Sequence, residues 1–297
     1  MDRKGIFFSH SYYVPSWSGL FTLLGLFIVG MAFGAIVMVL LHAFFSEEFY
    51  STYGTLFMYP VQFIPVMLYV ASRSRADSMT DYGFRVDNAN FGRIGPAWAA
   101  IAVTVMTLAA AVVSDLVSLW LPDMPEALEQ VLKGMTEGPV WLSLLTVSIM
   151  APLFEEWLCR GVLLRGLLHH TSAFWAILVS SLFFALIHGN PWQAVPAFIL
   201  GCLFGYVYYR TGSLKLTMLM HCVNNTAAVV MSNIPSVKDL DSLSEMMPTT
   251  LYAVLVGVSV AVIVWLCKVF RDIPLGGEKS SCEKLLPLMS QPSGDSL

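Results

Sequence analysis

The sequence contains very little charge. Only 12% of its 297 residues are Asp, Glu, Lys or Arg, whereas 57% are hydrophobic. A soluble domain carries about 25% charged residues, so this composition excludes an ordinary soluble domain and predicts an integral membrane protein. The net charge of −4, from 16 basic and 20 acidic residues, also argues against nucleic acid as a partner.

The sequence also lacks the patterns of several common kinds of site. Its five cysteines form no CxxC pair, so we interpret them as small buried hydrophobic residues rather than disulfides or metal ligands. There is no HExxH sequence, and no serine lies in a nucleophile elbow. No internal repeat is visible, which gives no support to a transporter built from inverted repeats.

Long apolar runs dominate what is present. A helix needs about 20 apolar residues to cross a bilayer, and the chain contains eight candidate runs. The first is too long for the apolar part of a signal peptide, so we expect it to remain as a span. The sequence thus predicts an all-α polytopic membrane protein, a bundle of about eight transmembrane helices around an internal polar cavity. The runs cover roughly 18–45, 51–72, 94–121, 139–167, 173–189, 192–210, 214–232 and 249–270.

The distribution of charge and of Gly, Ser and Pro predicts how the chain is organised. We expect a single transmembrane domain over 1–271, with its polar motifs within 139–232, and a flexible tail over 272–297. If the runs alternate in direction, basic residues gather on the side of the N-terminus, and the opposite side holds only Lys133 and Lys238. The positive-inside rule then places both termini in the cytoplasm.

Three charged residues lie within the fourth run, at Glu155, Glu156 and Arg160. A charge near the centre of a bilayer costs about 2.5–3.5 kcal/mol or more, so such residues normally face a bundle interior and mark a functional site. Glu156 and Arg160 are four residues apart and are predicted to form a supporting ion pair on one helix face. Glu155 points about 100° away around the helix and has no cation near it in sequence, so it is the candidate general base.

Two further pairs of residues share a helix face. Phe184 and His188 are four residues apart in the fifth run, and His221 and Asn225 are four residues apart in the seventh. Phe184 is expected to pack whatever the function. The polar residues also allow structural interpretations, with His188 as a helix cap and with His221 and Asn225 as hydrogen-bonding groups between helices.

These residues allow two kinds of chemistry. In the first, Glu155, His188 and His221 bind zinc, because two histidines and one glutamate are a common catalytic ligand set. In the second, which we favour, no metal or other cofactor is used. Glu155 and His188 then activate water, while His221 and Asn225 donate hydrogen bonds to the oxyanion that develops during hydrolysis.

Three short motifs together resemble a known family. EEWLCR at 155–160 matches EExxxR, FALIH at 184–188 matches FxxxH, and HCVNN at 221–225 matches HxxxN. Their order on successive apolar runs is similar to the CPBP family of intramembrane proteases, the CAAX proteases and bacteriocin-processing enzymes, also called the type II CAAX endopeptidase or Abi family. The motifs span about a quarter of the chain.

The resemblance implies a fold, an activity and a role for each motif residue. Members of this family are eight-helix membrane endopeptidases. By resemblance, Glu155 is the water-activating base and works with His188, and His221 with Asn225 stabilises the oxyanion. Glu156 and Arg160 resemble the family's supporting pair.

The implied partners are the lipid bilayer and a membrane-associated, prenylated or otherwise hydrophobic peptide substrate. Two other functions stay open from the sequence. The same residues could form a peptide-binding site in a non-catalytic immunity or scaffold protein, or a proton relay in a transporter.

Overall fold

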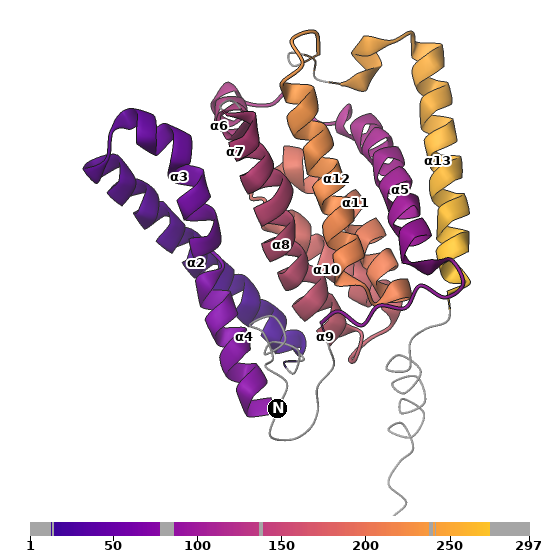
Figure 1. Ribbon diagram of the computed structural model, residues 1–297, viewed down its shortest axis with the longest axis horizontal. Helices are drawn as coiled ribbons and strands as arrows, with labels where there is room; N and C mark the ends of the chain where they lie inside the picture. The colour runs from indigo at the N-terminus through magenta and orange to yellow at the C-terminus, as the bar shows by residue number, and fades with distance from the viewer. Residues whose placement is uncertain are drawn as a thin grey trace, which may run out of the picture.

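The computed structural model describes residues 13, 15–77, 86–136, 139–237, 240 and 242–273, and these residues form helices and short connections without any strand (Figure 1). The all-α prediction is therefore confirmed for this part of the chain. Nearly all of the predicted flexible tail, from residue 274 onward, lies outside the described residues.

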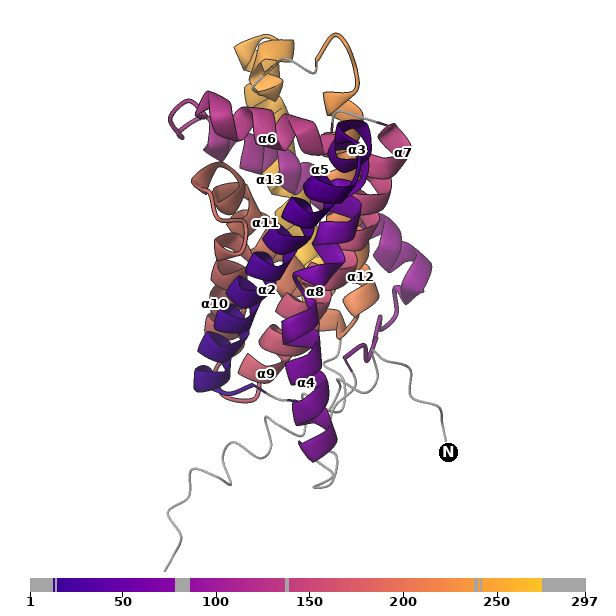
Figure 2. The ribbon, with the colours of Figure 1, turned by 90° about the vertical axis from the view of Figure 1, so that its left-hand side faces the viewer.

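The first three helices form an N-terminal unit, which Figures 1 and 2 show along one side of the bundle: α2 (Trp17–Phe44), α3 (Glu47–Val61) and α4 (Ile64–Asp77). A serine side chain caps the start of each of the first two helices. Ser16 accepts a hydrogen bond from the Gly19 backbone N–H, and Ser46 accepts one from Phe49. Such caps satisfy N–H groups that have no partner within the helix.

The break between α3 and α4 lies against α2. Pro60 is inside the last turn of α3, where it cannot donate a backbone hydrogen bond, and the chain turns at Gln62 and Phe63 before α4 begins. Gly30 of α2 faces this break. A Cβ atom at Gly30 would lie only 1.7 Å from the Gln62 carbonyl oxygen. The absence of a side chain at Gly30 therefore allows α2 to approach the break closely.

The fourth predicted run forms one continuous helical rod over Val140–Leu167, but its geometry is not uniform. A regular α-helical segment that carries both glutamates stands between two π-helical stretches. In chain order, the parts are α7 (Val140–Ser143), η2 (Leu144–Met150), α8 (Ala151–Glu156), η3 (Trp157–Leu164) and α9 (Arg165–Leu167). π-Helical turns are rare and occur frequently at functional sites.

The remaining helices complete the bundle. The chain offers clear signals at several of their ends: Asn190 caps the first turn of one helix, Ser213 caps that of another, and Gly212 adopts a left-handed φ of 66° between them. The helices are α5 (Gly95–Ser118), α6 (Glu126–Thr136), α10 (Ala173–Leu186), α11 (Pro191–Thr211), α12 (Leu214–Ser232), the short 3-10 helix η4 (Leu243–Met246) and α13 (Thr249–Arg271). Of these, α10, α11 and α12 lie against the rod, and α5 and α13 lie farther from it (Figure 1).

An extended segment, residues 86–90, runs along the turn between α11 and α12. The Asn88 N–H donates to the Gly212 carbonyl at 2.9 Å, and the Asn90 N–H donates to the Thr211 carbonyl at 2.7 Å. Asp87 accepts a hydrogen bond from the Leu214 N–H at 2.8 Å. This strap, defined as residues 86–90, fixes the start of α12.

The hydrophobic core has two parts. One part contains buried side chains of α2, the α3–α4 pair, the central rod and α10, including Phe184. The other contains side chains of α5, α11, α12 and α13, including Phe204. Phe184 and Phe204 both contact Arg160, so the two parts of the core meet at this charged residue.

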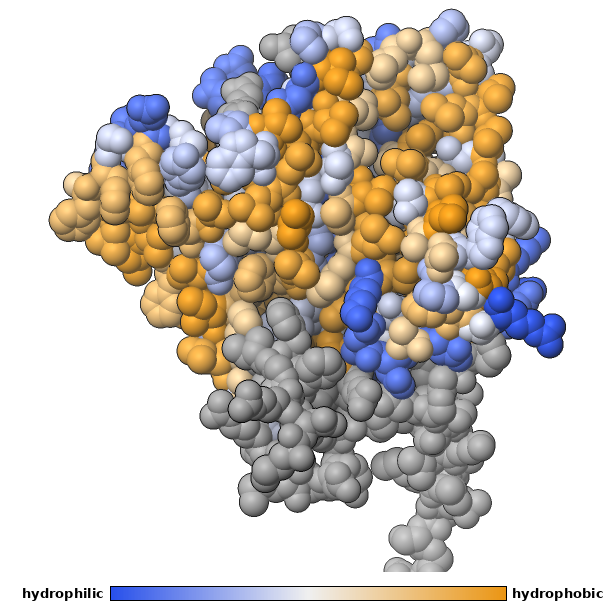
Figure 3. Space-filling model, viewed as in Figure 1, coloured by the Kyte–Doolittle hydropathy of each residue, from blue (hydrophilic) through white to orange (hydrophobic). Residues whose placement is uncertain are grey.

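Five described helical segments are long and apolar enough to cross a membrane, which supports an integral membrane protein. Figure 3 shows hydrophobic side chains over most of this face of the bundle, with hydrophilic ones toward its ends. The predicted count of eight spans is not confirmed. The segment α10 has only 14 residues, and α11 and α12 carry polar residues that lower their hydropathy. The five segments are Trp17–Phe44, Glu47–Ser74, Gly95–Ser118, Val140–Leu167 and Thr249–Arg271.

Candidate functional site

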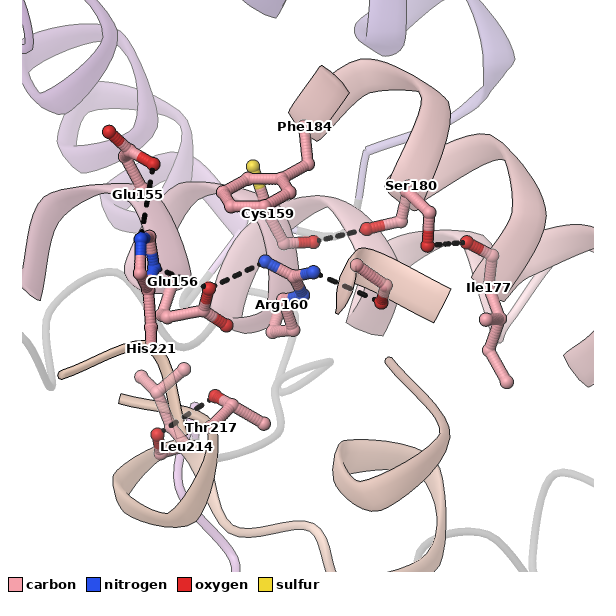
Figure 4. Close-up of polar contacts among 12 residues, drawn as sticks. Glu155, Glu156, Cys159, Arg160, Ile177, Ser180, Phe184, Leu214, Thr217 and His221 are labelled. Carbon is pink, nitrogen blue, oxygen red and sulfur yellow. Dashed lines mark hydrogen bonds and ion pairs between the residues drawn. The ribbon is translucent and has the colours of Figure 1, made fainter. Parts of the chain in front are cut away.

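Four of the residues singled out from the sequence lie in one buried row. Figure 4 shows it running from Glu155 through His221 and Glu156 to Arg160. Two elements supply these side chains, because the glutamates and the arginine lie on the central rod and His221 lies on α12. All four residues are at most 8% exposed.

Glu156 and Arg160 form the predicted ion pair. The Arg160 Nη1 donates to Glu156 Oε1 at 2.6 Å, and both side chains are completely buried. The Arg160 Nη2 donates to the Gly201 carbonyl of α11 at 3.1 Å. Mutual neutralisation greatly lowers the cost of burying two charges, and the extra hydrogen bond ties the rod to α11.

Aromatic rings enclose the Arg160 guanidinium. Its Cζ atom lies 4.4 Å from the centre of the Phe184 ring and 5.4 Å from that of Phe204. A cation over a ring face is stabilised by the ring quadrupole, particularly where water is excluded. The sequence predicted only that Phe184 packs, and in the structure it packs against the charged centre itself.

His221 lies between the two carboxylates. Its Nδ1 is 3.1 Å from Glu156 Oε1, and its Nε2 is 3.9 Å from Glu155 Oε2. A carboxylate only accepts hydrogen bonds, so Nδ1–H donates to Glu156. This bond fixes the ring and directs Nε2 toward Glu155.

Glu155 has a partner that sequence reasoning missed. The Tyr59 hydroxyl of α3 donates to Glu155 Oε1. The polar residues singled out within the apolar runs were charged residues, histidine and asparagine, and not tyrosine. Tyr59 is one of 11 tyrosines in an aromatic-rich chain, so nothing in the composition distinguishes it. The only local signal is Pro60, which marks a break in an otherwise apolar run.

Several buried polar atoms of the row have no hydrogen-bond partner among the described residues. They are Glu155 Oε2, Glu156 Oε2 and Arg160 Nε. Leaving such an atom unsatisfied typically costs about 1–3 kcal/mol, and more for charged groups. Glu155 Oε2 is the atom that also faces His221, so this buried oxygen keeps its capacity to accept a hydrogen bond from an added water or substrate.

His188 lies just beyond the end of α10 rather than within it. Its Nδ1 is 2.8 Å from the Phe184 carbonyl oxygen, which can only accept, so Nδ1 carries the proton. In the neutral ring, Nε2 is then a hydrogen-bond acceptor. His188 therefore caps the last turn of its helix, as the structural interpretation allowed, and this bond also orients its free ring nitrogen.

Phe184 connects His188 with the row. Its ring contacts the imidazoles of His188 and His221 edge-on, with centroid distances of 5.1 Å and 5.4 Å. Among the described residues, no hydrogen bond or ion pair joins His188 to Glu155 directly. The structure thus brings His188 near the row through an aromatic contact.

Asn225 lies one turn beyond His221 on α12. Its Nδ2 donates to the carbonyl oxygen of Val147 at 2.8 Å, within the π-helical stretch η2. An amide nitrogen carries two hydrogens, so this bond orients the side chain without using its full donor capacity. The sequence could not predict this contact, because its helical periodicity gives no indication of π-helical geometry.

The described residues contain no group of three or more His, Cys, Asp or Glu side chains placed to hold a metal ion. The predicted zinc ligands Glu155, His188 and His221 do not form such a group in the described part of the chain, and the Phe184 ring contacts both imidazoles. These positions do not fit a metal site. We therefore derive no chemical step through a metal.

The fold and site together define a helical membrane protein with a buried centre of two carboxylates, an imidazole and a guanidinium. Residues 137–227 match the family model for the Rce1-like type II CAAX prenyl endopeptidases, and this segment contains all three motifs. The match supports the resemblance of this segment to the CPBP and CAAX proteases.

A curated relative agrees with this resemblance. The chain is 28% identical over 106 residues to the "Putative membrane peptidase YdiL" of Bacillus subtilis (strain 168), a match that covers 36% of this chain and 43% of that protein. The chain thus spans less than half the length of this relative. No solved structure matches.

Proposed function

We propose that this protein is an intramembrane endopeptidase that hydrolyses peptide bonds in a membrane-associated, prenylated or otherwise hydrophobic peptide. The observation that carries the proposal is the position of Glu155. Its carboxylate is buried in a membrane-spanning rod, is held by Tyr59 through Oε1, and presents Oε2 toward His221 without a hydrogen-bond partner. The family match of residues 137–227 supports the same activity.

In the proposed reaction, Glu155 Oε2 takes a proton from a water molecule, and the water oxygen attacks the carbonyl carbon of the scissile peptide bond. His188 helps to position this water through Nε2. The carbonyl oxygen becomes an oxyanion. The proton held by Glu155 then passes to the leaving amine nitrogen as the C–N bond breaks.

The oxyanion is stabilised by His221 and Asn225 in this scheme. His221 protonated on both nitrogens can donate Nε2–H to the oxyanion while Nδ1–H stays on Glu156. Asn225 supplies the second hydrogen of an amide that Val147 already orients. Glu156 and Arg160 hold His221 in place and do not touch the substrate.

We further propose that the whole domain, residues 1–271, crosses the membrane eight times, with both termini in the cytoplasm. The order of the helices along the chain supports this arrangement, since short connections allow successive helices to cross the membrane in opposite directions. The short α10 and the polar α11 and α12 are shielded from lipid on the sides that carry the site, because their buried residues face the central rod and α5.

A direct test is hydrolysis of a fluorogenic, farnesylated peptide by purified protein in liposomes. We expect Glu155→Gln to lower the rate at least 100-fold, because a general base typically contributes about 10²- to 10⁴-fold. The matched control is Glu126→Gln, which makes the same change on the exposed first turn of α6 and should keep the wild-type rate.

The same preparation distinguishes the alternatives. Wild-type activity in Glu155→Gln would refute the proposed mechanism. Peptide binding without cleavage in both proteins would favour a binding function, and peptide flux without cleavage would favour a transporter. Each assay is repeated after treatment with a chelator, since loss of activity that zinc restores would refute the metal-free reaction.

A further inference from the structure

Tyr59 is the one described residue outside the family-matched segment that contacts Glu155 by a hydrogen bond. Its residue is only 8% exposed, and its hydroxyl reaches across from α3 to the central rod. The bond engages Oε1 alone. The other oxygen, Oε2, is the one that faces the His221 Nε2 at 3.9 Å.

The backbone around Tyr59 is held tightly, so the hydroxyl has a fixed position. Pro60 follows it directly and restricts the chain. The break that comes next packs on Gly30 of α2, where even one methyl group would collide with the Gln62 carbonyl. The Tyr59 ring also packs against Phe63, with centroids 5.6 Å apart.

The other titratable or charged groups around Glu155 cannot replace this bond. Glu156 and Arg160 are occupied with each other, and His221 donates to Glu156. Cys159 lies one turn further along the same rod, and its thiol is at best a weak donor. The phenol from the N-terminal unit is therefore the group that selects the orientation of the Glu155 carboxylate.

We propose that Tyr59 is a positioning residue for the reaction, and that it turns the Glu155 carboxylate so that Oε2 accepts the proton from water. This inference rests on the proposed protease function. It also assigns a role to the N-terminal unit, because α3 then completes a site whose other members lie between residues 155 and 225.

The test compares Tyr59→Phe with Tyr252→Phe in the liposome assay. Both substitutions remove only a buried hydroxyl that donates to a carboxylate, since Tyr252 donates to Asp115 Oδ2 at 2.7 Å, away from the site. We expect Tyr59→Phe to lower kcat about 10- to 100-fold with KM within about twofold of wild type, as is typical for loss of a hydrogen bond to a charged group. Tyr252→Phe should keep the wild-type kcat.

A second readout does not depend on activity. The infrared difference spectrum between wild type and Glu155→Gln identifies the carboxylate band of Glu155. We expect this band to shift in Tyr59→Phe and to stay in place in Tyr252→Phe. If wild-type protein cleaves no peptide, the protease function fails, and the infrared comparison still decides whether Tyr59 orients Glu155.

Three results would overturn the inference. The first is a wild-type kcat and KM in Tyr59→Phe, and the second is a wild-type kcat with a changed KM, which would indicate substrate binding instead. The third is an unshifted Glu155 band. Thermal unfolding of both variants checks that a lowered kcat reflects the lost hydroxyl and not a lost fold.

Discussion

Arg160 is held in the interior by an ion pair, a backbone carbonyl and two aromatic rings. Its removal would leave the Glu156 charge buried and paired only with His221. We therefore expect Arg160→Met to lower the free energy of unfolding by about 3–5 kcal/mol. Unfolding in mixed micelles, followed by tryptophan fluorescence, measures the change.

The control for this prediction is Arg271→Met, because the Arg271 side chain is 70% exposed and its ion pair with Asp272 should contribute little. Addition of Glu156→Gln to Arg160→Met should restore part of the lost stability by removing the uncompensated charge. Equal stability of the two single arginine variants would contradict the assignment of Arg160 as a buried structural charge.

Individual residues differ in how well sequence could predict them. The Glu156–Arg160 pair followed from a four-residue spacing within one helix, and such local geometry is set by the backbone. The contacts of Tyr59 and Asn225 join segments that are far apart in sequence, and no local pattern encodes them. His188 was predicted within the fifth apolar run, but it lies just beyond the end of α10, where its ring contacts Phe184.

The contact between α2 and the α3–α4 break gives a prediction for a whole element. Gly30→Ala must push the break away, because its Cβ would lie 1.7 Å from a backbone oxygen that cannot rotate aside. Displacement of the break carries Tyr59 with it. We expect peptidase activity to fall at least as far as in Tyr59→Phe, measured in the same liposome assay.

Gly25→Ala is the matched control, since it lies on the same helix and a Cβ there would meet nothing within 4 Å. It should keep wild-type activity and gain a little stability from the better helix propensity of alanine. If Gly30 acts through Tyr59, the double variant with Tyr59→Phe will lose less than the product of the two single losses. Fully independent losses would show that α2 affects the site by another route.

The sequence predicted the positions of most helices, but it did not predict the π-helical stretches within them. The second apolar run was predicted over 51–72, whereas the observed helices extend from Glu47, where Ser46 caps the first turn, to Asp77. The central run reads as one regular helix, whereas the structure has π-helical stretches on both sides of the glutamates. The first of these stretches packs mainly on α12 and the second mainly on α10, and neither can be inferred from a 3.6-residue period.

The proposed membrane topology gives a prediction for the whole molecule. We expect cysteines introduced at Ser172 and Lys215, which are exposed, to react with an impermeant reagent from the cytoplasmic side. Cysteines at Pro191 and Glu245 should react from the opposite side. Labelling is compared in sealed and opened vesicles, in a variant that lacks the native cysteines.

The position of Pro191 decides the number of spans. Labelling from the same side as Ser172 would show that α10 and α11 enter and leave the membrane on one side, and the chain would then cross six times. The sequence alone could not decide this, because polar residues lower the hydropathy of α11 and α12, and on α12 they include His221 and Asn225 of the site. Burial against neighbouring helices, and not composition, permits such residues within a bundle.

The strap of residues 86–90 has a mechanical consequence for the molecule. Its backbone hydrogen bonds to Gly212 and Thr211 fix the position of the chain along the strap, and they therefore determine which residue begins α12. A slip of one position would advance α12 by about 1.5 Å and turn it by about 100°, which would swing His221 off Glu156. The strap, which follows the N-terminal unit in the chain, therefore sets the position of His221, just as Tyr59 of that unit sets the orientation of Glu155.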